Sequence, residues 1–270
     1  MSVSTSQRLP ASRSREPRRG AGLPLLFAFV RIPLIAVSAA ATIAAFALAG
    51  TPVAFPTSPL ISALYLAPVN IACLFLLRSV LRRDGRRVRD LVGFSARRLP
   101  RDIGWGMLWL VVLYLPFLLA VIGTMLILYG SGAFSSFEAV FAPSPTSTPV
   151  LPLTAGFVLA ALVVVTFAPL NAPTEELVFR GYAQGGLYAS LGSAWPAILI
   201  PAFGFGVQHV FFAATPAGML VFGVAFFVWG VGSGLIYLRQ KRLMPLIVCH
   251  VIVNLLTSLP ALFVPFLLAD

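Results

Sequence analysis

Seven long apolar runs, separated by short polar segments, dominate the chain. They cover about residues 23–49, 59–79, 103–129, 150–180, 194–213, 216–238 and 243–268. A helix needs about 20 apolar residues to cross a bilayer, and each run meets or approaches that length. The pattern therefore predicts an all-α fold, a polytopic transmembrane helical bundle of about seven spans.

Composition and charge support this interpretation. Hydrophobic residues make up 59% of the 270 residues and charged residues only 10%, whereas soluble domains carry about 25% charged residues. The net charge of +11 comes largely from basic residues clustered in the N-terminal tail and in two loops. Such clusters are typical of membrane topology and of contact with membrane lipid, so nucleic-acid binding is not expected. Cys73 and Cys249 lie in apolar runs and are expected to be buried small hydrophobic side chains.

The basic clusters also predict the orientation. Residues 1–22 hold five arginines and nine more lie from Arg78 to Arg101, while residues 130–149 contain neither lysine nor arginine. Basic loops stay in the cytoplasm. We therefore expect a multi-pass protein of the cell membrane with a cytoplasmic N-terminus, a disordered basic tail over 1–22 and an external loop over 130–149.

Three charged side chains interrupt the fourth run. Glu175, Glu176 and Arg180 lie within six residues of otherwise apolar sequence, and each charge at the bilayer centre costs about 2.5–3.5 kcal/mol. Glu176 and Arg180 have the i,i+4 spacing of a helical ion pair. We therefore expect this pair to form and Glu175 to be left free to act, the alternative being an ion pair that only joins helices.

Two prolines precede the charged residues. Pro169 and Pro173 each lack a backbone donor, so the fourth span is expected to be either a broken helix or a single kinked one. The small and polar residues over 181–193 predict a turn at the membrane interface.

The two histidines of the chain lie in the fifth and seventh runs, at His209 and His250. Asn254 shares a helical face with His250 through its i,i+4 spacing. A single membrane histidine is often no more than an interhelical hydrogen bond. Together with a carboxylate, however, two imidazoles can bind zinc and leave a position for water. Alternatively, Glu175 deprotonates water directly while the other groups stabilise an oxyanion, and both routes predict hydrolysis of a carbonyl group.

Three motifs carry a resemblance to a known family. They are Glu175-Glu176-xxx-Arg180, Phe205-xxx-His209 and His250-xxx-Asn254. In order and spacing they resemble the motifs of the CPBP family of intramembrane proteases, the Abi superfamily, which includes the type II CAAX prenyl endopeptidases. The resemblance covers about residues 171–256, and the first three spans carry no diagnostic motif. It implies an endopeptidase that cleaves a membrane-associated or lipidated protein or peptide.

The resemblance also implies a role for each matching residue. Glu175 acts on the catalytic water, His209 and His250 line the same cavity, and Asn254 stabilises the oxyanion. Glu176, Arg180 and Phe205 are supporting residues. If a metal is used, the expected ion is zinc and its ligands are Glu175, His209 and His250; a metal-independent glutamate mechanism is the alternative. The catalytic core is then expected over 150–270, after N-terminal membrane helices and loops over 23–149, with the cavity among spans four, five and seven.

Other functions remain open at this stage. A non-catalytic membrane scaffold or a bacteriocin self-immunity protein could keep the same motifs and act by binding. A proton-coupled transporter also places glutamate and histidine in the membrane, but no internal repeat indicates the two halves of a transporter. No segment of the sequence indicates the natural substrate or an oligomeric state.

Overall fold

The apolar runs form helices in the computed structural model, which describes residues 20–263. Within this part of the chain no strand occurs, and seven helical segments are long and apolar enough to cross a membrane. These segments are Gly22–Leu48, Pro59–Arg83, Val88–Gly132, Leu153–Leu191, Ala194–Phe212, Pro216–Gln240 and Met244–Phe263. The predicted all-α, multi-pass architecture is confirmed.

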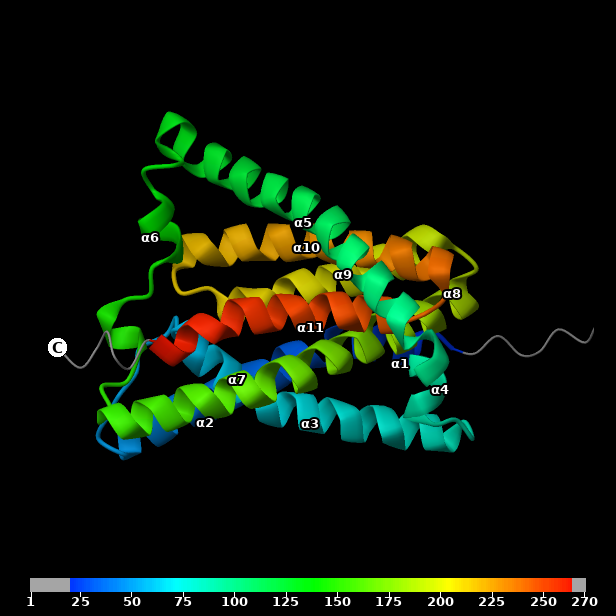
Figure 1. The fold of residues 1–270 in the computed structure, drawn as a ribbon, viewed down its shortest axis with the longest axis horizontal. Helices are drawn as coiled ribbons and strands as arrows, with labels where there is room; N and C mark the ends of the chain where they lie inside the picture. Colours follow the sequence, from blue (N-terminus) through cyan, green and yellow to red (C-terminus); the bar gives the residue numbers. More distant parts are fainter. Residues whose placement is uncertain (1–19, 264–270) are drawn as a thin grey trace, which may run out of the picture.

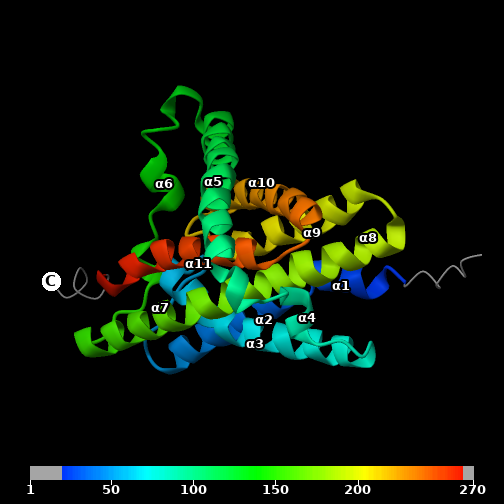
Figure 2. The same ribbon diagram turned by 45° about the vertical axis from the view of Figure 1, so that its right-hand side comes forward.

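The α-helices follow one another along the chain as α1 (Gly22–Phe29), α2 (Arg31–Leu48), α3 (Pro59–Arg83), α4 (Val88–Val92), α5 (Leu99–Tyr129), α6 (Phe137–Phe141), α7 (Leu153–Glu175), α8 (Gly185–Leu191), α9 (Ala194–His209), α10 (Pro216–Gln240) and α11 (Met244–Ser258). Six of the long helices, α2, α3, α7, α9, α10 and α11, run roughly along the long axis of the molecule (Figure 1). Helix α5 crosses α10 and α11 obliquely, and its far end diverges from the bundle (Figures 1 and 2). Helix α11 packs on α7, and α9 packs on the segment that follows α7, so the expected carriers of the site are neighbours in the bundle.

The first span is interrupted near its start. Helix α1 ends at Phe29 and α2 begins at Arg31. Pro33 has no backbone N–H to donate to the carbonyl of Phe29, and this missing hydrogen bond accounts for a break at Val30. The break matters because the side chain of Arg31 at this point is fully buried in the bundle.

The fourth span continues through the predicted turn. Helix α7 contains both Pro169 and Pro173, passes into a π-helical segment, η4 (Glu176–Gln184), and ends with α8 at Leu191. The prediction of an interfacial turn over 181–193 is therefore wrong for all but its last residues. Polar residues of this stretch such as Gln184 are buried, and its side-chain amide donates to the carbonyl of Gly234 at 2.8 Å. π-helical segments within α-helices are rare overall, and those that occur often lie at functional sites.

Small residues allow the interior helices to approach closely. A Cβ added at Gly204 on α9 would lie 1.9 Å from the carbonyl oxygen of Ala28 on α1. A Cβ added at Gly230 on α10 would lie 2.9 Å from the Cα of Ala202 on α9. Close contacts of this kind are a main source of helix association within a membrane. They hold α1, α9 and α10 together around the site.

The two loops used to predict the orientation lie at opposite ends of the bundle. Ser95 follows α4 and precedes α5, while Ser144 follows α6 and precedes α7, and these ends are far apart in Figure 1. Residues 1–19 of the predicted tail, and residues 264–268 of the predicted seventh span, lie outside the described residues. The sidedness of the membrane and the division at residue 150 stay predictions.

Cysteine labelling tests the orientation. With Ser95→Cys and Ser144→Cys as single variants in whole cells, an impermeant thiol reagent should label the second position and leave the first unlabelled until the membrane is permeabilised. The native Cys73 and Cys249 are buried and free, so wild type should give a low background. Labelling of both positions from the same side would contradict the predicted topology.

Candidate active site

Glu175 ends α7 deep in the bundle and is 0% exposed. Its two carboxylate oxygens have different surroundings. Oε1 accepts hydrogen bonds from Nη2 of Arg31 at 3.0 Å and from Nε2 of Gln208 at 2.9 Å. Oε2 has no hydrogen-bond partner within the described part of the chain. One oxygen is therefore held by the protein and the other is left to accept a hydrogen bond.

Arg31 organises a buried polar network around this carboxylate. Besides Glu175, its guanidinium donates to Oε1 of Gln208 at 2.6 Å, to Oδ1 of Asn70 at 2.7 Å and to Oδ1 of Asn171 at 3.1 Å. These side chains come from α2, α9, α3 and α7, so four spans meet at one arginine. A buried ion pair retains its charges only when further hydrogen bonds satisfy the remaining polar atoms, as they do here.

The expectation that Glu175 would be free of a counter-ion is wrong. Arg31 and Glu175 form an ion pair at 3.0 Å in which both side chains are 0% exposed. The two residues are 144 positions apart, so spacing along one helix could not reveal the pair. The sequence contained one indication of this pair, because Arg31 lies within an apolar span and an arginine there needs a partner in the bundle interior.

The second glutamate forms the predicted pair. Arg180 lies with Nη1 3.3 Å from Oε1 of Glu176, at i,i+4, and both side chains are buried. The guanidinium carbon of Arg180 is also 4.4 Å from the ring centre of Phe205. Contact of a cation with an aromatic face stabilises the charge where water is excluded. Phe205 thus contacts the pair, and its supporting role stays a prediction.

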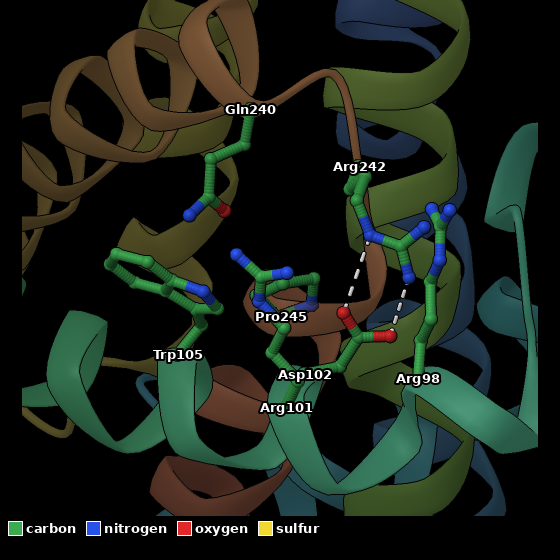
Figure 3. A pocket seen from close by; sticks show the side chains of 7 residues that line it. All are labelled: Arg98, Arg101, Asp102, Trp105, Gln240, Arg242 and Pro245. Carbon is green, nitrogen blue, oxygen red and sulfur yellow. Dashed lines mark hydrogen bonds and ion pairs between the residues drawn. The ribbon is translucent and has the colours of Figure 1, made fainter.

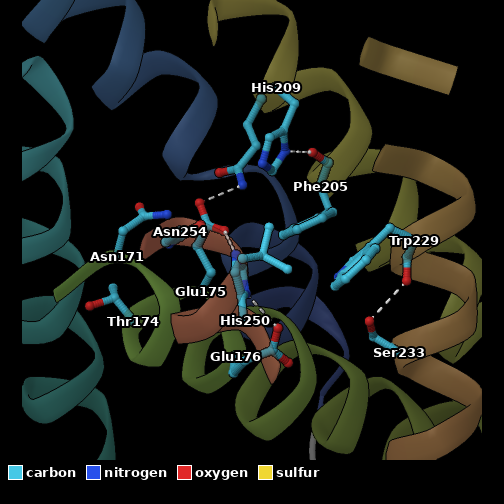
Figure 4. Close-up of polar contacts among 12 residues, drawn as sticks. Asn171, Thr174, Glu175, Glu176, Phe205, His209, Trp229, Ser233, His250 and Asn254 are labelled. Atoms are coloured by element: carbon cyan, nitrogen blue, oxygen red, sulfur yellow. Dashed lines mark hydrogen bonds and ion pairs between the residues drawn. The ribbon is translucent and has the colours of Figure 1, made fainter. Parts of the chain in front are cut away.

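His250 lies between the two carboxylates (Figure 4). Its Nδ1 is 3.0 Å from Oε1 of Glu176, and its Nε2 is 3.4 Å from Oε2 of Glu175. A carboxylate can only accept, so Nδ1 carries the proton and donates it to Glu176. Glu176 therefore orients the imidazole so that Nε2 faces the unpaired oxygen of Glu175.

His209 ends α9 and is held by its neighbours. Its Nδ1 donates to the carbonyl of Phe205 at 2.7 Å, and its ring stacks on Phe226 with a centroid distance of 3.6 Å. The ring centre of Phe205 is 4.5 Å from that of His209 and 6.1 Å from that of His250. The two histidine rings thus lie on either side of a shared contact with Phe205.

Asn254 lies one turn after His250 on α11 and is 6% exposed. Its Nδ2 is a buried donor without a hydrogen-bond partner among the described residues. Most buried polar groups in proteins are paired, so a buried donor without a partner calls for a functional explanation.

The formal charges of the site balance. Each glutamate has its own arginine, Arg31 for Glu175 and Arg180 for Glu176. Two acids and two guanidinium groups sum to zero when both histidines are neutral. This balance lowers the cost of burying four charges in the membrane interior.

Residues 154–256 match the family model Rce1-like, described as type II CAAX prenyl endopeptidase Rce1-like. The predicted resemblance is confirmed. All three motifs lie within the matched segment, and the family supports a protease that acts within a membrane. Searches of curated proteins and of solved structures give no significant match.

The Rce1-like match leaves part of the site unexplained. Arg31 and Asn70 lie before residue 154, in spans where the sequence showed no diagnostic motif. Gln208 and Asn171 lie within the match but outside the three motifs. All four are polar residues inside apolar runs, and this was the signal that could have indicated them.

The zinc expected from the resemblance can be tested against the side chains. Each histidine donates its Nδ1–H to a carboxylate or a carbonyl, which is the orientation typical of metal-binding histidines. Among the described residues, however, no three His, Cys, Asp or Glu side chains are arranged to hold a metal ion. These side chains as arranged therefore do not fit zinc.

Proposed function

We propose that this protein is an intramembrane endopeptidase that hydrolyses a peptide bond of a membrane-associated or lipidated protein or peptide. One observation carries the proposal: among the described residues, Oε2 of Glu175 is a buried carboxylate oxygen without a hydrogen-bond partner, 3.4 Å from Nε2 of His250. An unpaired carboxylate oxygen is suited to take a proton from water. The Rce1-like match supports a protease independently.

In the proposed reaction, Glu175 acts as a general base. Oε2 takes a proton from a water molecule, and the water oxygen attacks the carbonyl carbon of the scissile peptide. The carbonyl oxygen becomes negatively charged in the resulting tetrahedral intermediate. The proton then passes from Glu175 to the leaving nitrogen as the C–N bond breaks, which restores the carboxylate.

Arg31 and Gln208 act on the same carboxylate from its other side. They hold Oε1 with two hydrogen bonds, so the carboxylate cannot rotate freely and Oε2 stays directed at the site. Positioning of a catalytic group before the reaction removes the cost of arranging it in the transition state. We assign Arg31 this positioning role.

Binding of the water and stabilisation of the oxyanion are assigned to His250, His209 and Asn254. His250 has its Nδ1 hydrogen-bonded to Glu176 and its Nε2 3.4 Å from Oε2 of Glu175, so a water that donates one hydrogen to Oε2 can donate the other to this Nε2. Nδ2 of Asn254 is the buried donor left to stabilise the negative oxygen. Removing a single donor of this kind costs about 10²–10³-fold in turnover in well-studied hydrolases.

Substitution of Asn254 tests this assignment. Asn254→Ala should lower the turnover number by about 10²–10³-fold with little change in melting temperature, because its Nδ2 makes no hydrogen bond within the described residues. Thr166→Ala is a matched control: this exposed hydroxyl donates to the carbonyl of Leu162 within α7, so its removal should leave turnover unchanged. Full turnover in Asn254→Ala would rule out the oxyanion role.

The activity itself is tested with the full-length protein in liposomes. Peptides ending in a prenylated CAAX sequence and the same peptides without the lipid are incubated with it, and products are identified by mass spectrometry. The expected result is a single internal cleavage of the lipidated peptide. Binding of both peptides without cleavage would favour a scaffold. Loss of cleavage in a chelator and its recovery with zinc alone would overturn the metal-free mechanism.

A further inference from the structure

A second polar site lies apart from the glutamates, where the start of α5 meets the connection between α10 and α11. It is a pocket of about 390 Å³. Its walls are Arg98, Arg101, Asp102, Trp105, Gln240, Arg242 and Pro245 (Figure 3). None of these residues takes part in the network of Glu175, Glu176 and the two histidines, so the proposed reaction does not explain this pocket.

The charges of the pocket do not cancel. Asp102 is buried and forms a two-point ion pair with Arg242, with Nη2–Oδ2 at 2.6 Å and Nε–Oδ1 at 3.3 Å. Arg98 and Arg101 are exposed, and no carboxylate in the described part of the chain pairs with either. Arg98 directly precedes α5 and Arg101 lies in its first turn, and both side chains line the pocket together with Arg242 (Figure 3). Two guanidinium groups are therefore left to bind an anion, and guanidinium matches the geometry of phosphate well.

Trp105 and Gln240 complete the pocket wall, and Trp109 contacts both of them. Trp105 stacks on Trp109 with ring centres 5.4 Å apart and planes 17° apart. Nε1 of Trp109 donates to Oε1 of Gln240 at 3.1 Å, which leaves the Gln240 amide nitrogen as a further donor for the pocket. Tryptophan is enriched at the level of the lipid headgroups. The pocket thus has the composition of a membrane interface.

The apolar surface next to the pocket indicates where the phosphate comes from. Arg101, Trp105, Leu108 and Val112 follow at helical spacing along one face of α5. Leu108 is 47% exposed and Val112 is 45% exposed. A free phosphate ion would not contact this apolar face, whereas the acyl chains of a lipid would cover it.

We propose that this pocket binds the phosphate group of an anionic phospholipid. Arg98 and Arg101 contact the phosphate, and Asp102 fixes Arg242 as a wall of the pocket. Trp105 lies beside the glycerol, and the acyl chains lie along the exposed face of α5. The site holds one lipid at the end of the bundle where α5 crosses α11.

Tryptophan fluorescence of the full-length protein in detergent micelles tests the proposal. Phosphatidylglycerol with brominated acyl chains should quench at lower concentration than brominated phosphatidylcholine. The double variant Arg98→Gln/Arg101→Gln should bind phosphatidylglycerol roughly 30-fold more weakly, at about fivefold per arginine, and phosphatidylcholine almost unchanged. The double variant Trp105→Phe/Trp109→Phe should lose the quenching specific to phosphatidylglycerol.

Matched controls decide between a built site and general surface charge. Arg82→Gln/Arg83→Gln removes the same charge from exposed positions at the end of α3, outside the pocket, and should keep full binding. An equal loss in this control, or unchanged binding in the pocket variant, would overturn the proposal. Displacement of the lipid by inorganic phosphate at equal concentration would show a phosphate site with no lipid specificity. Equal melting temperatures exclude unfolding, since Arg98 and Arg101 have no ion pair within the described residues.

Discussion

Glu175→Gln should lower peptide hydrolysis by about 10²–10⁴-fold, because a glutamine amide cannot take a proton from water. It should also destabilise the protein. Arg31 would lose its carboxylate while it remains fully buried, and breaking one side of a buried pair costs about 3–5 kcal/mol. The side-chain amide oxygens of Gln208, Asn70 and Asn171 also accept hydrogen bonds from Arg31. The loss of unfolding free energy should therefore lie near the lower end of this range. Thermal melting and cleavage of the lipidated peptide measure the two effects.

The double variant Arg31→Gln/Glu175→Gln separates catalysis from stability. Each single substitution leaves one buried charge unpaired, whereas the double variant leaves none, so part of the lost stability should return. Activity should stay absent, because the base is still missing. Hydrolysis in the double variant would show that Glu175 is not the base and that only the charge balance matters. Arg83→Gln, an exposed arginine on α3, controls for the loss of a positive charge.

Glu176→Gln should act mainly on stability, by about 3–5 kcal/mol, since it leaves Arg180 buried without its counter-ion. Arg180→Gln should destabilise for the opposite reason, and the double variant Glu176→Gln/Arg180→Gln should recover part of the loss. Hydrolysis should fall less than for Glu175→Gln, because a glutamine oxygen can still accept from Nδ1 of His250.

The Gln variants of the two glutamates together test which of them is the general base. If Glu176→Gln were stable but inactive while Glu175→Gln still cleaved the peptide, the two roles would be reversed. If the double variant Glu176→Gln/Arg180→Gln were less stable than either single variant, the pair would not contribute through its opposite charges. Melting curves and turnover numbers in the same detergent provide both readings.

Features that depend on neighbours within one helix could be predicted from the sequence. The seven spans follow from the length of the apolar runs. The pair of Glu176 with Arg180, and the shared face of His250 and Asn254, follow from i,i+4 spacing. Both kinds of inference need only the geometry of a single helix. The predicted interfacial turn over 181–193 was wrong for its first part because residues 181–184 are buried against other helices, where protein rather than water satisfies Gln184.

The partner of Glu175 was decided by the tertiary structure alone. By itself the sequence determined a seven-span bundle and a set of ionisable residues too costly to face lipid. It did not determine that Arg31 of the first span and Gln208 of the fifth would hold Oε1, nor that Oε2 would be the oxygen left unpaired. Which helices cross at a given depth depends on close packing, such as that of Gly204 against Ala28. Such packing brings together side chains from distant parts of the chain, and no spacing along one helix encodes it.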